Sequence, residues 1–344
     1  MLNFVLVGFG GMGSYHLELL NQENIFNIYG VYDIDSSKTE VAEKLGYKAF
    51  NSLEEVCEDG EVDVVLVATP NDTHLYIATK LMEAKKHVIC EKPVGLSKNE
   101  LESMISTSIK NGVKFTVNQN RRYDTDFLTA KSVIEAREIG DTFKIQSNVM
   151  GSRGIPGDWR GREENGGGML FDWGIHMIDQ ALLMIDQSPE SLYCKFTHAT
   201  NEEVDDGFDI TLNYSSGLIF NISCSTCNFL ENNRWNIFAN NGSAYIKMWQ
   251  EIGETIVLES WDDVDVKPIK ASSGFTKTMA KRIDGDNKLV KKSIKFQKAD
   301  CKDIYRNFSN AVKGSDELVI THDSLLETMN VLEKCFESVK TNRV

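Results

Sequence analysis

The sequence lacks an excess of basic residues and lacks long apolar runs. Its 37 Lys and Arg residues are outnumbered by 51 Asp and Glu residues, so the formal net charge is −14. A field of that sign repels phosphate backbones and anionic lipid surfaces, which argues against nucleic-acid and membrane partners. The longest uncharged stretch, 210–230, is rich in Ser, Thr and Asn and is too polar for a membrane-spanning helix. No basic leader with a small-residue cleavage site opens the chain.

A regular set of paired cysteines is also lacking. The seven cysteines are odd in number and scattered, and a chain of 344 residues needs no disulfides to hold its fold. We therefore expect a reducing, cytoplasmic environment. Cys224 and Cys227 have the spacing of a redox motif, but they lie in a strand-like run and are interpreted as ordinary thiols. A zinc ribbon would need a second such pair, so no metal site is predicted.

The chain contains two successive patterns of secondary structure. Short apolar runs at 4–7, 28–32, 62–68, 87–90 and 114–117 alternate with helical patterns, as in a doubly wound parallel sheet. After residue 191, alternating runs separated by hairpin turns indicate an antiparallel sheet, and 304–312 and 324–339 read as closing helices. The fold class expected is an α/β Rossmann domain over 1–121, followed by an α+β domain over 122–344 with a large, mostly antiparallel open sheet. The Lys/Ser/Gly-rich stretch 271–295 is interpreted as a mobile surface excursion or lid.

A glycine-rich turn follows the first predicted strand. Residues 8–13 match G-x-G-x-x-G and precede an amphipathic helix. Gly8 permits the tight turn, Gly10 lets a pyrophosphate approach the backbone, and Gly13 allows the helix to pack close to the strand. The N-terminus of that helix offers free N–H groups and a positive dipole end to phosphates.

An acidic residue stands where this motif requires one. Asp33 ends the second strand, 20 positions beyond Gly13, where its carboxylate would accept hydrogen bonds from ribose hydroxyls and repel a 2′-phosphate. NAD is therefore favoured over NADP. Asp35 reinforces this preference, whereas Lys38 is a contrary sign.

Polar residues also follow two further strands of the parallel sheet. Residues 69–74 (Thr-Pro-Asn-Asp-Thr-His) and 91–93 (Glu-Lys-Pro) lie at the carboxyl edge, where ligands bind in such sheets. Lys92 could donate to a substrate hydroxyl and, by like-charge repulsion, lower the pKa of a neighbouring imidazole. The Lys92–Pro93 peptide bond is a candidate for the cis form.

The segment 166–179 combines three glycines with a helical pattern that carries Asp172, His176 and Asp179. Asp172 and His176 are spaced i,i+4 and Asp179 is three residues further on, so the three share one helix face. A carboxylate beside an imidazole suits a general base. A zinc site and a purely structural role at a domain interface are the alternatives.

These segments together resemble the Gfo/Idh/MocA oxidoreductases, the family of glucose–fructose oxidoreductase and inositol dehydrogenase. The resemblance covers nearly the whole chain. It implies that Lys92, Asp172 and His176 form the catalytic set for oxidising a sugar or polyol alcohol, and that the open sheet forms homodimers or homotetramers. The cofactor contacts that we predict are Gly8, Phe9, Gly10, Gly11, Met12, Gly13, Asp33, Thr69, Pro70, Asn71, His74, Glu91, Lys92 and Asn120. The candidate substrate contacts are Arg122, Tyr123, Trp159, Arg160, Asp172 and His176.

The expected activity is hydride transfer between a nicotinamide cofactor and a secondary alcohol or ketone of a sugar or inositol-like polyol. Two alternatives remain open. One is an NAD-using glycosidase that oxidises its substrate transiently, and the other is a dinucleotide-binding regulator without turnover. Specificity is expected in the loops around 151–165, 226–235 and 271–295.

Overall fold

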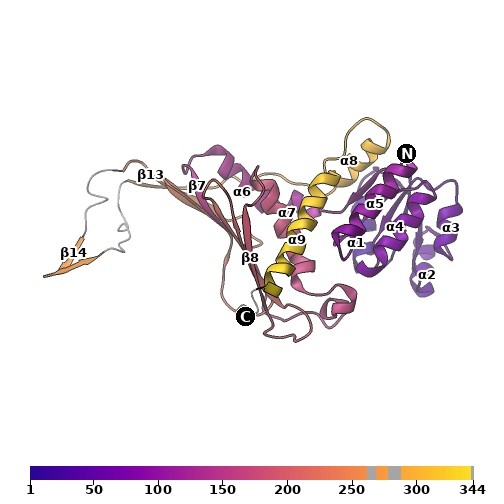
Figure 1. Cartoon of the computed structure of the whole chain (residues 1–344). Helices are drawn as coiled ribbons and strands as arrows, with labels where there is room; N and C mark the ends of the chain where they lie inside the picture. The colour runs from indigo at the N-terminus through magenta and orange to yellow at the C-terminus, as the bar shows by residue number, and fades with distance from the viewer. Residues whose placement is uncertain (262–268, 278–287, 342–344) are drawn as a thin grey trace.

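The computed structural model describes residues 1–261, 269–277 and 288–341. They form two large sheets with helices packed between and around them, and a separate two-stranded hairpin (Figure 1). None of the described helices is long and apolar enough to cross a membrane.

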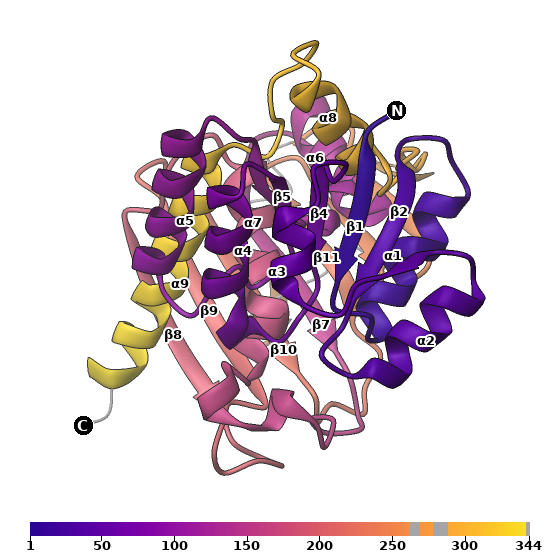
Figure 2. The same cartoon turned by 90° about the vertical axis from the view of Figure 1, so that its right-hand side faces the viewer.

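The first sheet is a six-stranded parallel sheet, as the sequence predicts. Its strand order is β3-β2-β1-β4-β5-β6, with the reversal of winding between β1 and β4. The elements are β1 (Asn3–Val7), α1 (Gly11–Asn21), β2 (Asn27–Tyr32), α2 (Ser36–Lys44), β3 (Lys48–Ala49), α3 (Leu53–Glu58), β4 (Val64–Val67), α4 (His74–Glu83), β5 (His87–Cys90), α5 (Lys98–Asn111) and β6 (Phe115–Val117). All four residues of β4 are buried because helices cover both faces of the sheet (Figure 2).

The second sheet has eight strands in the order β16-β13-β12-β11-β7-β10-β9-β8. Every neighbouring pair is antiparallel except β7 and β10, which run parallel. Its elements are α6 (Thr125–Ala136), β7 (Thr142–Met150), α7 (Ile175–Met184), β8 (Ser191–Thr197), β9 (Gly207–Asn213), β10 (Ile219–Ser225), β11 (Asn233–Ala239), β12 (Gly242–Lys247), β13 (Gly253–Leu258), β16 (Leu289–Ser293), α8 (Asp303–Val312) and α9 (His322–Thr341).

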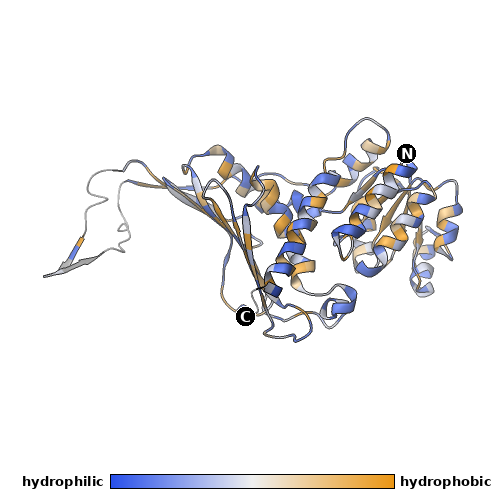
Figure 3. Ribbon diagram, in the orientation of Figure 1, coloured by the Kyte–Doolittle hydropathy of each residue, from blue (hydrophilic) through white to orange (hydrophobic). Residues whose placement is uncertain are grey.

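One face of this second sheet is covered by α6, α7 and α9, which lie between it and the first domain (Figure 1). The helices are banded with hydrophobic and hydrophilic residues, as expected for elements that bury one side (Figure 3). The mostly antiparallel open sheet expected from the sequence is therefore confirmed.

The stretch 271–295, expected to be a mobile surface excursion or lid, contains paired strands. Residues 289–293 form β16 at the edge of the large sheet, paired with β13. β14 (Ile269–Ser272) and β15 (Phe275–Lys277) form a separate hairpin on the side of the sheet remote from the first domain (Figure 1). That position does not cover the carboxyl edge of the first sheet. Residues 278–287 lie outside the described part of the chain.

The C-terminal helices return to the first domain. The start of α9 and the residues just before it cover the edge strand β6. Thr116 Oγ1 donates to the carbonyl of Ile320 (3.3 Å), and His322 Nε2 lies 3.0 Å from the carbonyl of Phe115. Further along α9, Glu333 accepts a hydrogen bond from the backbone N–H of Lys98 at the start of α5 (2.7 Å). The proposed boundary between residues 121 and 122 therefore separates the two sheets, but the C-terminal segment still packs against the first domain.

Candidate active site

The glycine turn has the geometry of a phosphate-binding loop. Gly8 has φ +96°, and a Cβ there would lie 2.5 Å from the carbonyl oxygen of Ala68. A Cβ on Gly13 would lie 2.1 Å from the carbonyl oxygen of Gly8, so the fold itself requires both glycines. A Cβ on Gly10 would meet no atom of the described residues within 4 Å. Gly10 is thus not demanded by packing, which is the pattern expected where a ligand approaches the backbone.

The carboxylate of Asp33 ties this turn to the end of β2. Its Oδ2 accepts a hydrogen bond from the backbone N–H of Phe9 (2.6 Å), and its Oδ1 accepts one from Asp35 (2.9 Å). Lys38 Nζ lies 3.5 Å from Oδ2. The predicted partner for the ribose therefore stands directly beside the glycine turn.

His74 holds two of the predicted loops together. Its side chain is fully buried, with Nδ1 2.9 Å from the carbonyl of Pro93 and Nε2 2.8 Å from the carbonyl of Thr69. Burial lowers its pKa. His74, a predicted cofactor contact, fixes the turn after β4 against the turn after β5. Asn71 is also buried, and its Nδ2 lies 3.4 Å from the carbonyl of Gly166.

Glu91 is a buried carboxylate held by two side-chain donors. Its Oε1 accepts from His16 Nε2 (2.7 Å) and from Asn118 Nδ2 (2.5 Å), and the other nitrogen of His16 is hydrogen-bonded to the hydroxyl of Tyr305 on α8. Burial opposes ionisation, but the His16 and Asn118 hydrogen bonds outweigh it and hold the pKa of Glu91 below its usual value. Glu91 thus joins the glycine-turn helix α1, β5 and the second domain.

Lys92 reaches across to the segment that carries Asp172. Its Nζ donates to the carboxylate Oδ1 and to the backbone carbonyl of Asp172, both at 3.0 Å. Arg160 Nε lies 3.5 Å from the other oxygen of that carboxylate. Burial raises the pKa of Asp172, but Lys92 and Arg160 outweigh this effect, so the pKa lies below its usual value. The Lys92–Pro93 peptide bond is cis, as the sequence suggested.

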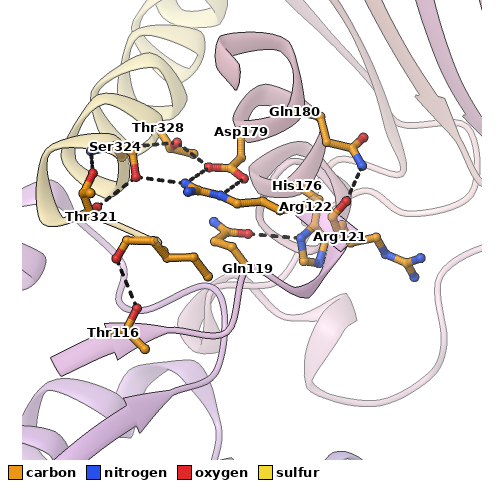
Figure 4. A network of polar contacts seen from close by, with 11 residues as sticks. Thr116, Gln119, Arg121, Arg122, His176, Asp179, Gln180, Thr321, Ser324 and Thr328 are labelled. Carbon is orange, nitrogen blue, oxygen red and sulfur yellow. Dashed lines mark hydrogen bonds and ion pairs between the residues drawn. The ribbon is translucent and has the colours of Figure 1, made fainter. Parts of the chain in front are cut away.

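The imidazole of His176 is held by Gln119 and not by Asp172. Residues Leu170–Gly174 form a π-helical turn before α7, which changes the i,i+4 relation expected from the sequence. His176 Nδ1 lies 3.2 Å from the amide oxygen of Gln119, so Nδ1 carries the proton and Nε2 keeps its lone pair (Figure 4). Burial, reinforced by the positive charges of Lys92, Arg121 and Arg234, lowers the pKa of His176 well below its usual value. The neutral imidazole is thus a proton acceptor.

Arg122 and Asp179 form a buried ion pair away from this imidazole. Arg122 Nε and Nη2 lie 2.7 and 2.6 Å from the two carboxylate oxygens of Asp179, and Nη2 also donates to Ser324 Oγ (3.0 Å). Thr328 completes the group from α9 (Figure 4). Arg122 is a predicted substrate contact; its side chain is only 7% exposed and is paired with Asp179. Asp179, expected to share the face of His176, serves this pair instead.

The remaining predicted residues lie in several surroundings. Arg160 contacts Asp172, and its guanidinium also lies over the ring of Trp159 at 4.6 Å. Tyr123 is partly buried, and burial raises its pKa. Asn120 begins a short 3-10 turn, and its buried Oδ1 has no hydrogen-bond partner among the described residues. Such an acceptor beside Gln119 fits a polar group of a bound ligand.

Sequence reasoning missed several residues of the site. Gln119 directly precedes the predicted contacts, and a scan of polar residues after β6 could have found it. Trp173 packs beside His176, with ring centroids 6.3 Å apart, and Trp249 packs on Trp173 at 5.7 Å. Trp249 comes from the turn between β12 and β13, where no sequence signal marks it. Over the described ranges, no group of three His, Cys, Asp or Glu side chains is placed to hold a metal ion.

Two family models match the chain. The first, described as the oxidoreductase family with an NAD-binding Rossmann fold, matches residues 2–119, and the second, the GFO/IDH/MocA C-terminal domain, matches residues 127–245. Among solved structures, an NAD-binding protein from Listeria innocua is 34% identical, with a TM-score of 0.89 over 99% of this chain and 96% of that chain.

Two curated relatives match over shorter segments. An uncharacterized oxidoreductase of Schizosaccharomyces pombe is 30% identical over 198 residues, or 56% of this chain and 53% of that protein. The scyllo-inositol 2-dehydrogenase (NADP(+)) of Bacillus subtilis is 30% identical over 214 residues, or 61% of this chain and 59% of that enzyme. The matched segments thus span less than two thirds of these relatives. With both family models and a full-length structural relative in agreement, the chain belongs to the Gfo/Idh/MocA oxidoreductases, whose N-terminal domain is an NAD-binding Rossmann fold.

Proposed function

We propose that this protein is a dehydrogenase that interconverts a secondary alcohol and a ketone on a sugar or inositol-like polyol. The observation that carries the proposal is the meeting of Lys92, from the turn after β5, with Asp172, on the segment that leads into His176. An ammonium group and a neutral imidazole are suited to alcohol oxidation, because the first stabilises negative charge on the hydroxyl oxygen and the second accepts its proton.

In this proposal His176 is the general base. Its Nε2 lone pair takes the hydroxyl proton, and the hydrogen bond between Nδ1 and Gln119 keeps the ring in the required tautomer. Lys92 donates a hydrogen bond to the same oxygen and stabilises the negative charge that develops there. Asp172 holds the ammonium in place through its carboxylate and its backbone carbonyl.

A bound nicotinamide dinucleotide would supply the acceptor for the hydride that leaves the carbinol carbon. The glycine turn, Asp33 and residues 69–71 are the groups that would hold it. The open backbone at Gly10 and the orphaned acceptor on Asn120 support that fit. We propose NAD over NADP, because the Asp33 carboxylate at the end of β2 would repel a 2′-phosphate.

The test is a panel of inositols, aldoses and keto-sugars with NAD(H) and NADP(H), followed at the nicotinamide absorbance band. We expect stoichiometric reduction of NAD by at least one neutral polyol. A glycosidase would release a leaving group without net NADH, and a regulator would bind the dinucleotide without turnover. Either of those results would replace the dehydrogenase proposal.

We further propose a cytoplasmic homodimer or homotetramer joined through the open face of the eight-stranded sheet. The free state of all seven cysteines supports a reducing compartment. Light scattering coupled to size-exclusion chromatography measures the oligomer. A monomer at micromolar concentration would contradict this part of the proposal.

A further inference from the structure

Beside the proposed catalytic residues lies a cluster of two indoles and a guanidinium, which we call the indole cluster: Trp173, Trp249 and Arg121. The Arg121 guanidinium lies 4.6 Å from the ring centre of Trp173 and 5.5 Å from that of Trp249. Trp173 in turn contacts the ring of His176. The ring contacts therefore lead from the proposed base through Trp173 to Trp249.

Trp249 has a backbone conformation that bulky residues rarely adopt. Its φ is +55°, in the left-handed region where glycine and asparagine are the usual residues. Backbone outliers of this kind persist only where the surrounding structure maintains them, and they are concentrated at ligand-binding positions. Trp249 is also 56% exposed, although its ring packs against Trp173. A large aromatic group is thus held in a strained conformation with more than half of its surface available.

Three cations near the site have carboxylate partners. The pairs are Lys92 with Asp172 at 3.0 Å, Arg160 with Asp158 at 2.6 Å, and Arg121 with Asp124 at 3.1 Å. A phosphate or carboxylate on the substrate would have to displace one of these partners. An uncharged ligand would not, so the charge balance favours a neutral substrate.

From these observations we infer that Trp249 is a specificity-determining residue that stacks on the C–H face of an uncharged, polyhydroxylated ring. The C–H groups of such a ring are polarised by their oxygens and are attracted to the negative face of an indole. Arg121 and Trp173 hold the indole in position, and the opposite end of the ring reaches His176. This inference rests on the proposed dehydrogenase function and names the class of its substrate.

The first experiment compares Trp249→Ala with Trp249→Phe in steady-state assays on the best neutral cyclic polyol. We expect Trp249→Ala to raise KM about tenfold, equivalent to about 1.4 kcal/mol of lost binding, with kcat changed less than twofold. Trp249→Phe keeps an aromatic face and should stay within about threefold of the wild-type KM. Trp249→Gln provides a second non-aromatic variant if Trp249→Ala is poorly folded.

The matched control is Trp261→Ala. Trp261 is a comparably exposed tryptophan, with 61% of its surface accessible. Its Nε1 donates to the carbonyl of Asn240, at the opposite end of β12 from Trp249. This variant should leave KM unchanged. Calorimetric titration of the polyol into the enzyme–NADH complex measures Kd without turnover, because both ligands are already reduced. The Kd ratios of the variants to wild type should equal their KM ratios.

The outcomes separate the two levels of the argument. If no polyol in the panel is oxidised or bound by the wild type, the dehydrogenase function and this inference both fail. If a polyol is oxidised but Trp249→Ala leaves KM and Kd within twofold of wild type, only the stacking role fails. A sugar phosphate or uronate with a higher kcat/KM than every neutral ring would overturn the substrate class alone.

Discussion

The buried pair of Arg122 and Asp179 allows a quantitative test of whether Arg122 is structural or contacts substrate. Replacing Arg122 with Met leaves the Asp179 carboxylate buried, with Thr328 as a remaining donor at 3.1 Å. Removing one partner of a buried ion pair typically lowers the free energy of unfolding by about 3–5 kcal/mol. At roughly 2 °C per kcal/mol for a chain of this size, Tm should fall by about 6–10 °C.

The assay is urea and thermal unfolding of four proteins followed by circular dichroism: wild type, Arg122→Met, Asp179→Leu and the double variant. We expect the double variant to recover most of the loss, because it buries no unpaired charge. Lys131→Met is the control, since Lys131 pairs with Glu135 at the surface at 3.9 Å and should contribute less than about 0.5 kcal/mol. Unchanged stability together with a raised KM in Arg122→Met would refute the reasoning and restore the substrate role that the sequence suggested.

Three further predictions concern the site. Lys92→Ala should lower kcat by about 10²–10³-fold while NADH affinity, measured by fluorescence, stays within about threefold; unchanged turnover would remove Lys92 from the mechanism. Because burial, aided by Lys92, depresses the pKa of His176, the neutral base persists as pH falls through the usual histidine value of about 6.5. The acid limb of kcat/KM for alcohol oxidation should thus lie below that pH, and a limb above it would contradict the assignment. Gly10→Ala should fold normally but bind NADH at least about tenfold more weakly. Gly13→Ala should lose stability, because its Cβ would collide with the Gly8 carbonyl. Normal NADH affinity in Gly10→Ala would argue against a phosphate-binding role for the turn.

The first domain could be predicted almost completely from local signals. The continuous apolar run that becomes β4 and the glycine turn before α1 each carry their own geometric requirement. The second sheet was predictable as antiparallel but not in its strand order. The parallel pairing of β7 with β10 joins segments about 75 residues apart along the chain, and no local pattern encodes it.

The site was predictable where a residue type and a strand end coincide, as at Lys92. It was not predictable where partners are chosen in three dimensions. The π-helical turn at Leu170–Gly174 separates Asp172 from His176. Asp172 therefore pairs with Lys92, and His176 with Gln119. Trp249 lies on a turn more than 70 residues beyond His176 in the sequence, and only the folded sheet brings it to the site.

The covering of β6 by Ile320 and by His322 at the start of α9 has a consequence for isolating the nucleotide-binding half. A fragment ending near residue 121 would expose the outer edge of β6 at Phe115 and Thr116, and His16 would lose Tyr305. Exposed strand edges recruit other strands, so such a fragment should self-associate when produced alone. Dissection of this protein into autonomous modules would therefore have to carry α8 and α9 along with the first sheet.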